Sequence, residues 1–300
     1  MSDVQRYLAE EIALDCRDGF TSRREALRRL TLLGVGSAAA AALLAGCKDN
    51  PSAPAAGAGG AGGGASPGPG ATAALPASAV TFAGPEGRTL QAAYAGAAKA
   101  RGAVLVIHEN RGLTDHFRTL AGRFAGAGYS ALALDLLSAE GGTASLGDPA
   151  NATAALGKAP PERFVADMRA GLDELARRAP GLKLGAIGFC FGGGMMWRLV
   201  AAKDPRVAAA APFYGPLPEG ADFAGSKAAV LGVYAENDAR VNASRDAAKA
   251  ALERAGLAHE IVTYPGVDHA FFNDTGPRHN GEAAAKAWAK VLEWFGRHVG

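Results

Sequence analysis

Cysteine, aspartate and histidine occur at three separated points of the chain where together they could carry out nucleophilic catalysis. Cys190 lies between glycines, and Asp238 and His269 follow it in that order. A thiolate can attack a carbonyl carbon, an imidazole can carry the proton, and a carboxylate can hold the imidazole in the required tautomer. The three residues are therefore a candidate catalytic set for acyl transfer.

The residues around Cys190 match a sharp turn between a strand and a helix. Positions 188–192 read Gly-Phe-Cys-Phe-Gly, which is Gly-x-Ser-x-Gly with cysteine in place of serine. A nucleophile on such a turn needs strained backbone angles and neighbours without a Cβ. The helix predicted to follow points its positive end at the thiol, which favours the thiolate. These features predict that Cys190 is the nucleophile.

The elements that must position these residues follow from the hydrophobic pattern. From residue 78 to the end, apolar runs of strand length alternate with amphipathic stretches of helical length. This alternation predicts the α/β class, with a mostly parallel sheet covered by helices on both faces and an antiparallel hairpin over 81–96 ahead of it. Strands are predicted at 103–109, 129–137, 183–189, 206–215, 228–238 and 259–266, and helices at 116–127, 161–179, 193–203, 242–255 and 280–298.

Four polar residues fall at the carboxyl ends of the predicted strands, where catalytic groups collect in such sheets. Glu109 and Asp238 end two strands, Cys190 follows a third, and His269 lies a few residues beyond a fourth. Taken alone, the cysteine could be a small buried apolar group, the aspartate a turn residue and the histidine a solvated loop residue. Their joint placement favours catalysis.

Composition argues against several other classes of protein. The chain has 300 residues, with 31 basic and 29 acidic side chains and a net charge of +2, so no nucleic-acid partner is indicated. It contains no Gly-x-x-x-x-Gly-Lys-Ser/Thr phosphate loop and no Cys-x-x-Cys pair. His116, His259, His279 and His298 are expected at surface or helix positions without zinc-ligand spacing, so no metal site is predicted.

Residues 1–47 have the order of an export signal. Arg23 and Arg24 precede an uncharged stretch over 30–47 that ends in Leu-Ala-Gly-Cys. The arginines resemble a twin-arginine signal, and the ending resembles a bacterial lipobox, which implies cleavage before Cys47 and lipidation of its sulfur. We therefore expect export to the bacterial cell envelope (periplasm or cell surface) and a membrane tether at Cys47. A membrane-spanning helix is the alternative, although 18 residues are borderline when about 20 are needed.

Two further segments precede the folded domain, which is predicted over 78–300. Residues 1–21 could form an amphipathic helix with Val4, Leu8 and Ile12 on one side, and no function is assigned to it. Residues 48–77 are mostly Ala, Gly, Pro and Ser, which predicts a disordered linker. Removal of the signal would leave Cys190 without an intrachain cysteine partner, which argues against a disulfide.

The domain resembles the dienelactone hydrolase family over residues 80–298. The motifs that carry the resemblance are HENRG (108–112), GFCFGGG (188–194), YAENDARV (234–241) and GVDHAFFNDTGPR (266–278). The resemblance implies an α/β-hydrolase fold and a carboxylic ester or lactone hydrolase, with Cys190 as nucleophile and Asp238 and His269 as its partners. It also implies that Glu109 holds the resting thiol and helps to deliver the thiolate. The alternative for Glu109 is an ion pair with Arg111 or Arg118.

The mechanism expected from this constellation proceeds through a thioester. Cys190 attacks the carbonyl, the backbone N–H groups of Phe191 and Asn110 bind the oxyanion, and water hydrolyses the thioester with His269 as base. No metal or organic cofactor is needed. The alternative function is that of a membrane-tethered binding protein with a catalytically silent hydrolase fold.

The sequence departs from the family's pattern where its best-known members bind a substrate carboxylate with arginines. Ala139 and Glu140 occupy the first such region, and Asn273 occupies the second. Arg278, in the same loop as Asn273, is a candidate substitute, as is Asn273 itself for substrate binding. A neutral ester or lactone therefore fits this chain as well as dienelactone.

Overall fold

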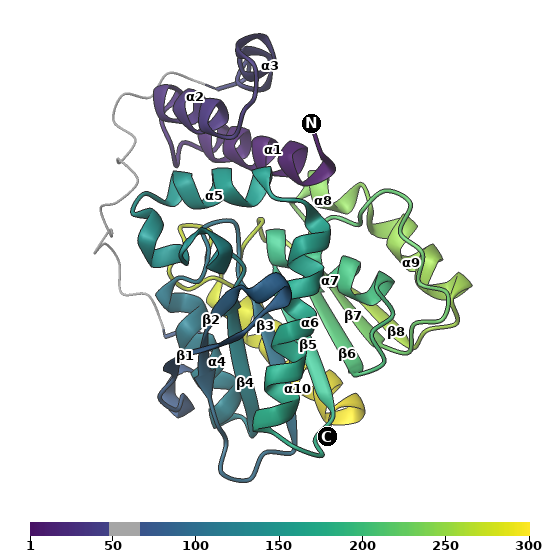
Figure 1. The fold of residues 1–300 in the computed structure, drawn as a ribbon. Coiled ribbons are helices and arrows are strands. Elements are labelled where there is room, and N and C mark those ends of the chain that lie inside the picture. Colours follow the sequence, from purple (N-terminus) through teal and green to yellow (C-terminus); the bar gives the residue numbers. More distant parts are fainter. Residues whose placement is uncertain (48–66) are drawn as a thin grey trace.

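One eight-stranded sheet forms the centre of the computed structural model, which describes residues 1–47 and 67–300 (Figure 1). The strand order is β1-β2-β4-β3-β5-β6-β7-β8, with β1 antiparallel to β2, β2 antiparallel to β4, and the remaining pairs parallel. The predicted hairpin and the predicted parallel strands are confirmed. The strands are β1 (Ser78–Ala83), β2 (Thr89–Ala95), β3 (Gly102–Ile107), β4 (Tyr129–Asp135), β5 (Leu184–Phe189), β6 (Val207–Phe213), β7 (Ala229–Ala235) and β8 (His259–Tyr264).

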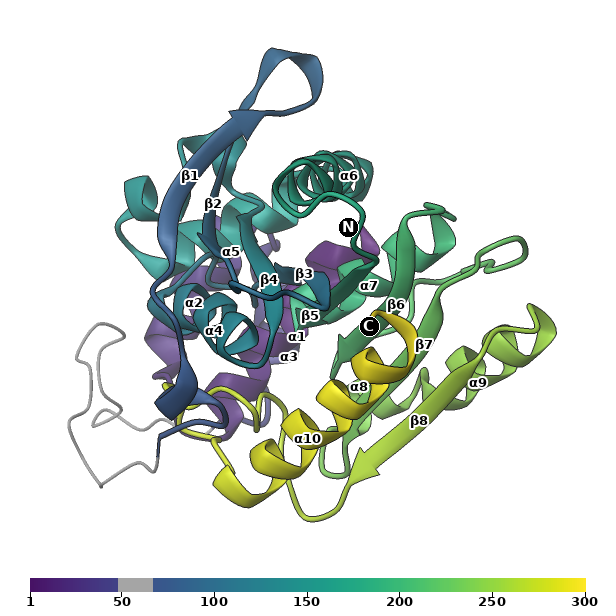
Figure 2. The same ribbon diagram turned by 90° about the horizontal axis from the view of Figure 1, so that it is seen from below.

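Helices cover both faces of the sheet, with α4 and α10 on one face and α6 and α7 on the other (Figure 2). β3, β4, β5 and β7 are buried along their whole lengths, which explains their continuous apolar sequences. The helices of the domain are α4 (Asp115–Gly126), α5 (Pro149–Lys158), α6 (Pro161–Arg178), α7 (Phe191–Ala201), α8 (Ala239–Asn242), α9 (Arg245–Arg254) and α10 (Gly281–His298). Short 3-10 turns are η1 (Ala71–Ala73), η2 (Pro85–Gly87), η3 (Ser138–Glu140) and η4 (Thr143–Leu146).

The N-terminal extension, residues 1–47, packs on the domain as three helices: α1 (Asp3–Arg17), α2 (Arg23–Leu32) and α3 (Ser37–Leu43). Figure 1 shows α1 lying across the top of the molecule beside α5. The predicted amphipathic helix is confirmed, since Val4, Leu8 and Ile12 are buried. Within the described residues, no helix has the length and apolar character needed to cross a membrane.

The segment 67–77 differs from the disorder predicted for 48–77, of which 48–66 lie outside the described residues. The backbone N–H of Leu75 donates to the carbonyl oxygen of Gly122 at 3.0 Å, and that of Gly68 donates to Asp274 Oδ2 at 3.0 Å. Glycines of α4 permit this approach: a Cβ on Gly122 would lie 2.2 Å from the Leu75 oxygen. The composition that predicts disorder thus also supplies small residues that can lie against a helix.

Gly126→Ala is expected to disturb this packing. The added Cβ would lie 1.8 Å from the carbonyl oxygen of Ala73, so the segment must move away from α4. Such overpacking costs about 1–3 kcal/mol of unfolding free energy, measurable by urea denaturation. Gly281→Ala is the matched control, because its Cβ would meet only His279 Cε1, at 3.8 Å. Equal stability of the two variants would contradict the close approach.

Candidate active site

Cys190 lies on the sharp turn that its flanking glycines predict, between β5 and α7. Its backbone has φ 56° and ψ −116°, a left-handed region that is strained for a residue with a side chain. A Cβ on Gly188 would lie 2.2 Å from the carbonyl oxygen of Gly192, and a Cβ on Gly192 would lie 2.5 Å from that of His108. Both glycines are therefore required by the turn, which places a free thiol at the N-terminus of α7.

Asp238 and His269 are in direct contact, although 31 positions separate them in sequence. His269 Nδ1 lies 2.5 Å from Asp238 Oδ2, and the other carboxylate oxygen accepts from the Val241 N–H at 3.3 Å. Burial alone would raise the pKa of Asp238, but the charge and hydrogen bond of His269 lower it below its ordinary value. The ionised carboxylate thus fixes the imidazole with Nε2 directed away from it.

Cys190 and His269 are brought together with a third ionisable group, Glu11 of α1. The thiol sulfur, an imidazole nitrogen and a Glu11 oxygen all lie within 4.8 Å of one another. Burial raises the pKa of the thiol, and the nearby Glu11 charge raises it further. Burial alone would lower the pKa of His269, but Glu11 and Asp238 raise it well above its ordinary value of 6.5.

Glu109 is held beside this group by two neutral side chains. The Tyr214 hydroxyl donates to Oε1 at 3.2 Å, and the Asn273 amide donates to Oε2 at 2.8 Å. The alternative ion pairs of Glu109 with Arg111 and Arg118 are not found: the first arginine lies 3.9 Å from Asp15, and the second lies 3.9 Å from Asp115. Asn273, a candidate for substrate binding, is thus a partner of Glu109.

The two backbone groups predicted to bind an oxyanion lie at this site. Phe191 is the first residue of α7, so its N–H has no carbonyl one turn earlier in the helix to accept from it. Asn110 lines the same cavity as Cys190, Glu109 and His269. The arrangement can therefore supply a nucleophile, a base and hydrogen-bond donors to one carbonyl group.

The cavity above Cys190 has a volume of about 130 Å³ and is partly closed by α1. The Tyr7 hydroxyl donates to Cys190 Sγ at 3.3 Å, and Glu11 Oε2 lies 3.5 Å from His269 Nε2. Neither Tyr7 nor Glu11 is among the site residues predicted from the sequence. A signal for them exists, because Tyr7, Glu11 and Asp15 recur every four residues and so share one side of a helix.

Arg278 also faces this cavity, but acidic residues of the extension bind it. Its guanidinium lies 3.0 Å from Asp15 and 2.8 Å from Asp18, and it stacks over the ring of Phe20 at 4.6 Å. Burial alone would lower the pKa of Arg278, but Asp15 raises it above its ordinary value. The candidate carboxylate-binding arginine is therefore occupied by carboxylates from its own chain.

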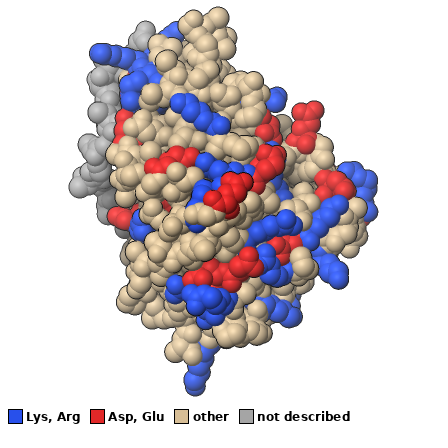
Figure 3. Space-filling model, viewed as in Figure 1, with Lys and Arg blue, Asp and Glu red and all other residues tan. Residues whose placement is uncertain are grey.

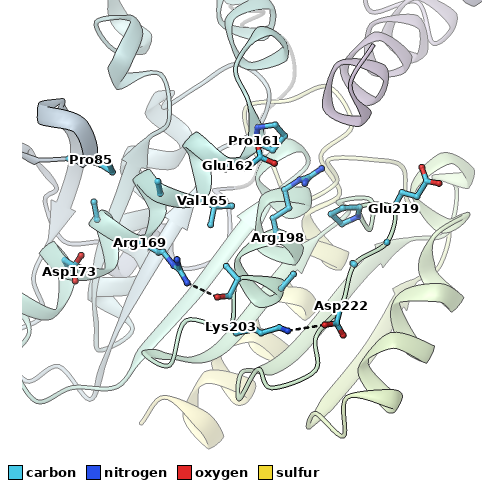
Figure 4. A pocket seen from close by; sticks show the side chains of 18 of the residues that line it. Pro85, Pro161, Glu162, Val165, Arg169, Asp173, Arg198, Lys203, Glu219 and Asp222 are labelled. Carbon is cyan, nitrogen blue, oxygen red and sulfur yellow. Dashed lines mark hydrogen bonds and ion pairs between the residues drawn. The ribbon is translucent and has the colours of Figure 1, made fainter.

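A larger cavity, of about 950 Å³, lies between α6, α7 and residues 218–222 (Figure 4). Neither Cys190 nor His269 lines it. Two of the basic groups that line it already have partners: Lys203 lies 3.1 Å from Asp222, and Arg169 donates to the carbonyl oxygen of Ala202 at 2.7 Å. Acidic and basic side chains are interspersed on this side of the molecule (Figure 3). This cavity offers no nucleophile and is not the reactive centre.

Glu11, Cys190 and His269 are also ligand types that zinc accepts. Each already has a partner of another kind, since Glu11 pairs with Arg240, the thiol accepts from Tyr7 and the imidazole is oriented by Asp238. The positions of Cys190 and His269 suit proton transfer between the thiol and the imidazole.

The parallel sheet, the strained turn at Cys190 and the order of the three residues define the α/β-hydrolase fold. The sequence matches the dienelactone hydrolase family over residues 90–299, and the chain belongs to that family. It is a hydrolase, as the sequence predicts. The fold expected from the sequence is confirmed.

Individual relatives agree with this assignment. The "Putative carboxymethylenebutenolidase" of Salmonella typhi is 32% identical over 214 residues, which cover 66% of this chain and 77% of the relative. Among solved structures, the "Putative Dienelactone Hydrolase" of Klebsiella pneumoniae subsp. pneumoniae is 29% identical with a TM-score of 0.64, and the match covers 74% of this chain and 99% of that one. The dienelactone hydrolase of Anabaena variabilis, at 22% identity and a TM-score of 0.60, shares the fold over 75% of this chain and 98% of its own.

Proposed function

We propose that this hydrolase cleaves a carboxylic ester or lactone with Cys190 as nucleophile, through a thioester intermediate. The observation that carries the proposal is the Cys190–His269–Asp238 arrangement, in which a thiol on a strained turn lies beside an imidazole held at 2.5 Å by a buried carboxylate. A silent binding protein would have no need to keep this strained backbone.

The reaction begins when His269 Nε2 takes the thiol proton and Cys190 Sγ attacks the carbonyl carbon. The oxyanion accepts hydrogen bonds from the N–H groups of Phe191 and Asn110, each such donor being worth about 3–4 kcal/mol. The tetrahedral species collapses to a thioester as the alcohol departs with the proton from His269. Water then gives a proton to the imidazole and attacks the thioester, which releases the acid and restores the thiol.

Glu109 opposes early ionisation of the nucleophile. A carboxylate beside a thiolate disfavours the charged sulfur, and the Glu109 charge contributes to the raised pKa of Cys190. Tyr214 and Asn273 hold this carboxylate in place. A substrate that draws the carboxylate away would therefore favour the thiolate when it binds.

The substrate class that we propose is a small ester or lactone without a required carboxylate. Ala139, Glu140 and Asn273 replace the arginines with which better-known family members bind a carboxylate. Arg163 neutralises Glu140 at 2.6 Å, and Asn273 is engaged with Glu109. The partner that we propose is this small molecule, and not a nucleic acid.

Cys190→Ala tests the nucleophile. With p-nitrophenyl acetate, we expect the native chain to release p-nitrophenol and to carry an acetyl group on the peptide containing Cys190, as detected by mass spectrometry. The variant should show neither, because alanine cannot form the thioester. Cys47→Ala is the matched control, since it removes another buried thiol and should keep at least the native rate. An acetyl group on a different residue would disprove the assignment.

We also propose that residues 22–47 direct export and that Cys47 carries the lipid anchor. Support comes from the Arg-Arg pair followed by the uncharged stretch and the Leu-Ala-Gly-Cys ending. In the docked extension Cys47 is buried, with its sulfur 3.8 Å from the Ala13 carbonyl oxygen. Cleavage and lipidation would therefore require this part of the extension to leave the domain.

Cys47→Ser is expected to move the protein from the membrane fraction to the soluble fraction of fractionated bacteria, because serine cannot accept the thioether-linked lipid. Immunoblotting of both fractions provides the measurement. Cys16→Ser, a second cysteine of the same extension, is the control and should stay with the membranes. A membrane-bound Cys47→Ser protein would show that another element provides the anchor.

A further inference from the structure

We propose that α1 is an inhibitory segment that covers the active site, and that the enzyme turns over only during the intervals in which α1 moves away, so that the native chain hydrolyses esters at a low but measurable rate. The inference rests on the proposed function for the identity of the reactive groups. It assigns a role to residues 3–18, for which the sequence pattern alone indicates none. Three independent features of the described structure support it: the space left at the thiol, the charge placed at the base, and the contacts that hold α1.

The space at the thiol is too small for a substrate. Tyr7 covers the nucleophile, since its hydroxyl lies 3.3 Å from Cys190 Sγ. Cys190 itself is almost completely buried. The remaining cavity of about 130 Å³ is well below the roughly 300–1,000 Å³ of ordinary small-molecule sites.

The charge that α1 brings also disables the base. Glu11 Oε2 lies 3.5 Å from His269 Nε2, the nitrogen that must accept the thiol proton. A carboxylate at this position stabilises the imidazolium, which has no lone pair left for a proton, and it disfavours a thiolate nearby. Accordingly, the Glu11 charge raises the pKa of His269 and the pKa of Cys190. Burial alone would raise the pKa of Glu11, but the charges of His269 and Arg240 lower it below its ordinary value. Arg240 also pairs with Glu11, so the carboxylate stays ionised and in place.

The contacts that hold α1 combine apolar packing with complementary charge. Leu8 is completely buried between α1 and the domain, near Gly157 of α5, where a Cβ would lie 3.4 Å from Leu8 Cδ1. Acidic residues along α1 pair with basic residues of the domain, and these ion pairs are Asp3–Arg198, Glu11–Arg240, Asp15–Arg111, Asp15–Arg278 and Asp18–Arg278. Every one of these acidic groups comes from α1 or the turn after it, so α1 binds as one unit.

Glu11 and Tyr7 could in principle assist catalysis instead of preventing it. The geometry favours inhibition, because both groups occupy the positions that the reaction needs for other atoms. The carbonyl carbon must approach Sγ where the Tyr7 hydroxyl lies, and the departing alcohol must receive a proton from Nε2 where the Glu11 carboxylate lies.

Leu8→Asp in the full-length chain tests the proposal. A buried aspartate should displace α1 without touching Cys190, His269 or Asp238. Leu27→Asp is the matched control, because the same change is made at an exposed leucine of the same extension. Two quantities are measured for each protein: kcat/KM for p-nitrophenyl acetate, and the rate at which iodoacetamide alkylates Cys190, followed by mass spectrometry of its peptide. Faster tryptic cleavage after Arg17 reports that α1 has been displaced.

We expect Leu8→Asp to raise both kcat/KM and the alkylation rate at least tenfold, and Leu27→Asp to leave both within twofold of the native chain. Faster alkylation without any ester hydrolysis would uphold the blocked site and overturn the proposed hydrolytic function. Unchanged rates in a protein whose α1 is demonstrably displaced would overturn the inhibitory role. Loss of a native activity on displacement would also overturn it, because Tyr7 and Glu11 would then assist the reaction.

Tyr7→Ala provides a second test if Leu8→Asp does not yield soluble protein. This variant keeps Val4, Leu8 and Ile12 on the apolar face, and the acidic residues of α1 that form ion pairs. It removes the side chain above the thiol, whose ring also lies 4.3 Å from the Arg240 guanidinium. Alkylation of Cys190 should accelerate at least fivefold, whereas an unchanged rate would show that Tyr7 does not obstruct the nucleophile.

Discussion

Asp238→Asn is expected to lower kcat for ester hydrolysis by about a thousandfold to ten-thousandfold, with little effect on stability. The carboxylate accepts from His269 Nδ1 at 2.5 Å and so keeps the other ring nitrogen free to take the thiol proton. An asparagine can present its amide N–H to Nδ1, which favours the opposite tautomer and places the proton on Nε2. The imidazole then cannot act as a base, although its position changes little.

The measurement is steady-state hydrolysis of p-nitrophenyl acetate at saturating substrate, with circular dichroism to show that the fold is intact. Asp268→Asn is the matched control, because this aspartate precedes His269 and makes an exposed hydrogen bond with Asn237 at 3.0 Å. It should retain kcat within threefold. If Asp238→Asn also retained kcat within tenfold, His269 would be oriented by another group and the catalytic assignment of Asp238 would be wrong.

Asp274→Asn is expected to reduce the free energy of unfolding by about 3–5 kcal/mol, since it leaves a buried cation without its counter-charge. One carboxylate oxygen lies 2.6 Å from His116 Nδ1, and the other accepts from Arg123 at 2.6 Å and from the Gly68 N–H at 3.0 Å. His116 lies on a helix as predicted, but it is buried. This cluster ties the loop that carries His269 to α4.

Urea denaturation of both proteins measures the effect, and Asp115→Asn is the control because its side chain on α4 is fully exposed.

The difference in unfolding free energy between the native protein and Asp274→Asn should depend on pH. Burial alone would raise the pKa of Asp274, but His116 and Arg123 lower it well below its ordinary value of 3.8. A lowered pKa contributes stability that is complete above 3.8 and is lost as the pH falls through the folded-state pKa. The difference should therefore shrink in acid, and a constant difference down to about pH 2 would contradict the ionised cluster.

The sequence predicts the sheet and the reactive centre because both depend on local patterns. Continuous apolar runs identify the parallel strands, and their carboxyl ends must share one edge, so Glu109, Cys190, Asp238 and His269 were expected to meet. The paired glycines around Cys190 predict the strained turn, since only residues without a Cβ fit at 2.2 and 2.5 Å from backbone oxygens. These constraints act within a few residues or through a regular sheet.

The contacts that α1 and the loop around Asn273 make with the active site could not be predicted from local patterns. The apolar positions of α1 predict a helix, but nothing local indicates that Tyr7 would reach a thiol 183 positions away. The Asn273 contact with Glu109 and the Asp15 contact with Arg278 likewise depend on how loops meet in three dimensions. The composition of segment 67–77 predicts disorder, and it does not show which small residues will pack against a complementary helix.

The Tyr7 contact with Cys190 also has a consequence for the chemical lifetime of the nucleophile. A thiolate exposed to peroxides is oxidised to a sulfenic acid and then irreversibly to sulfinic and sulfonic acids, and the rate depends on access and on the thiolate fraction. With α1 in place, the sulfur is buried, accepts a hydrogen bond from Tyr7 and has a raised pKa, so both factors are small. A chain that reached an oxidising compartment with α1 still bound would carry its cysteine there in the reduced form.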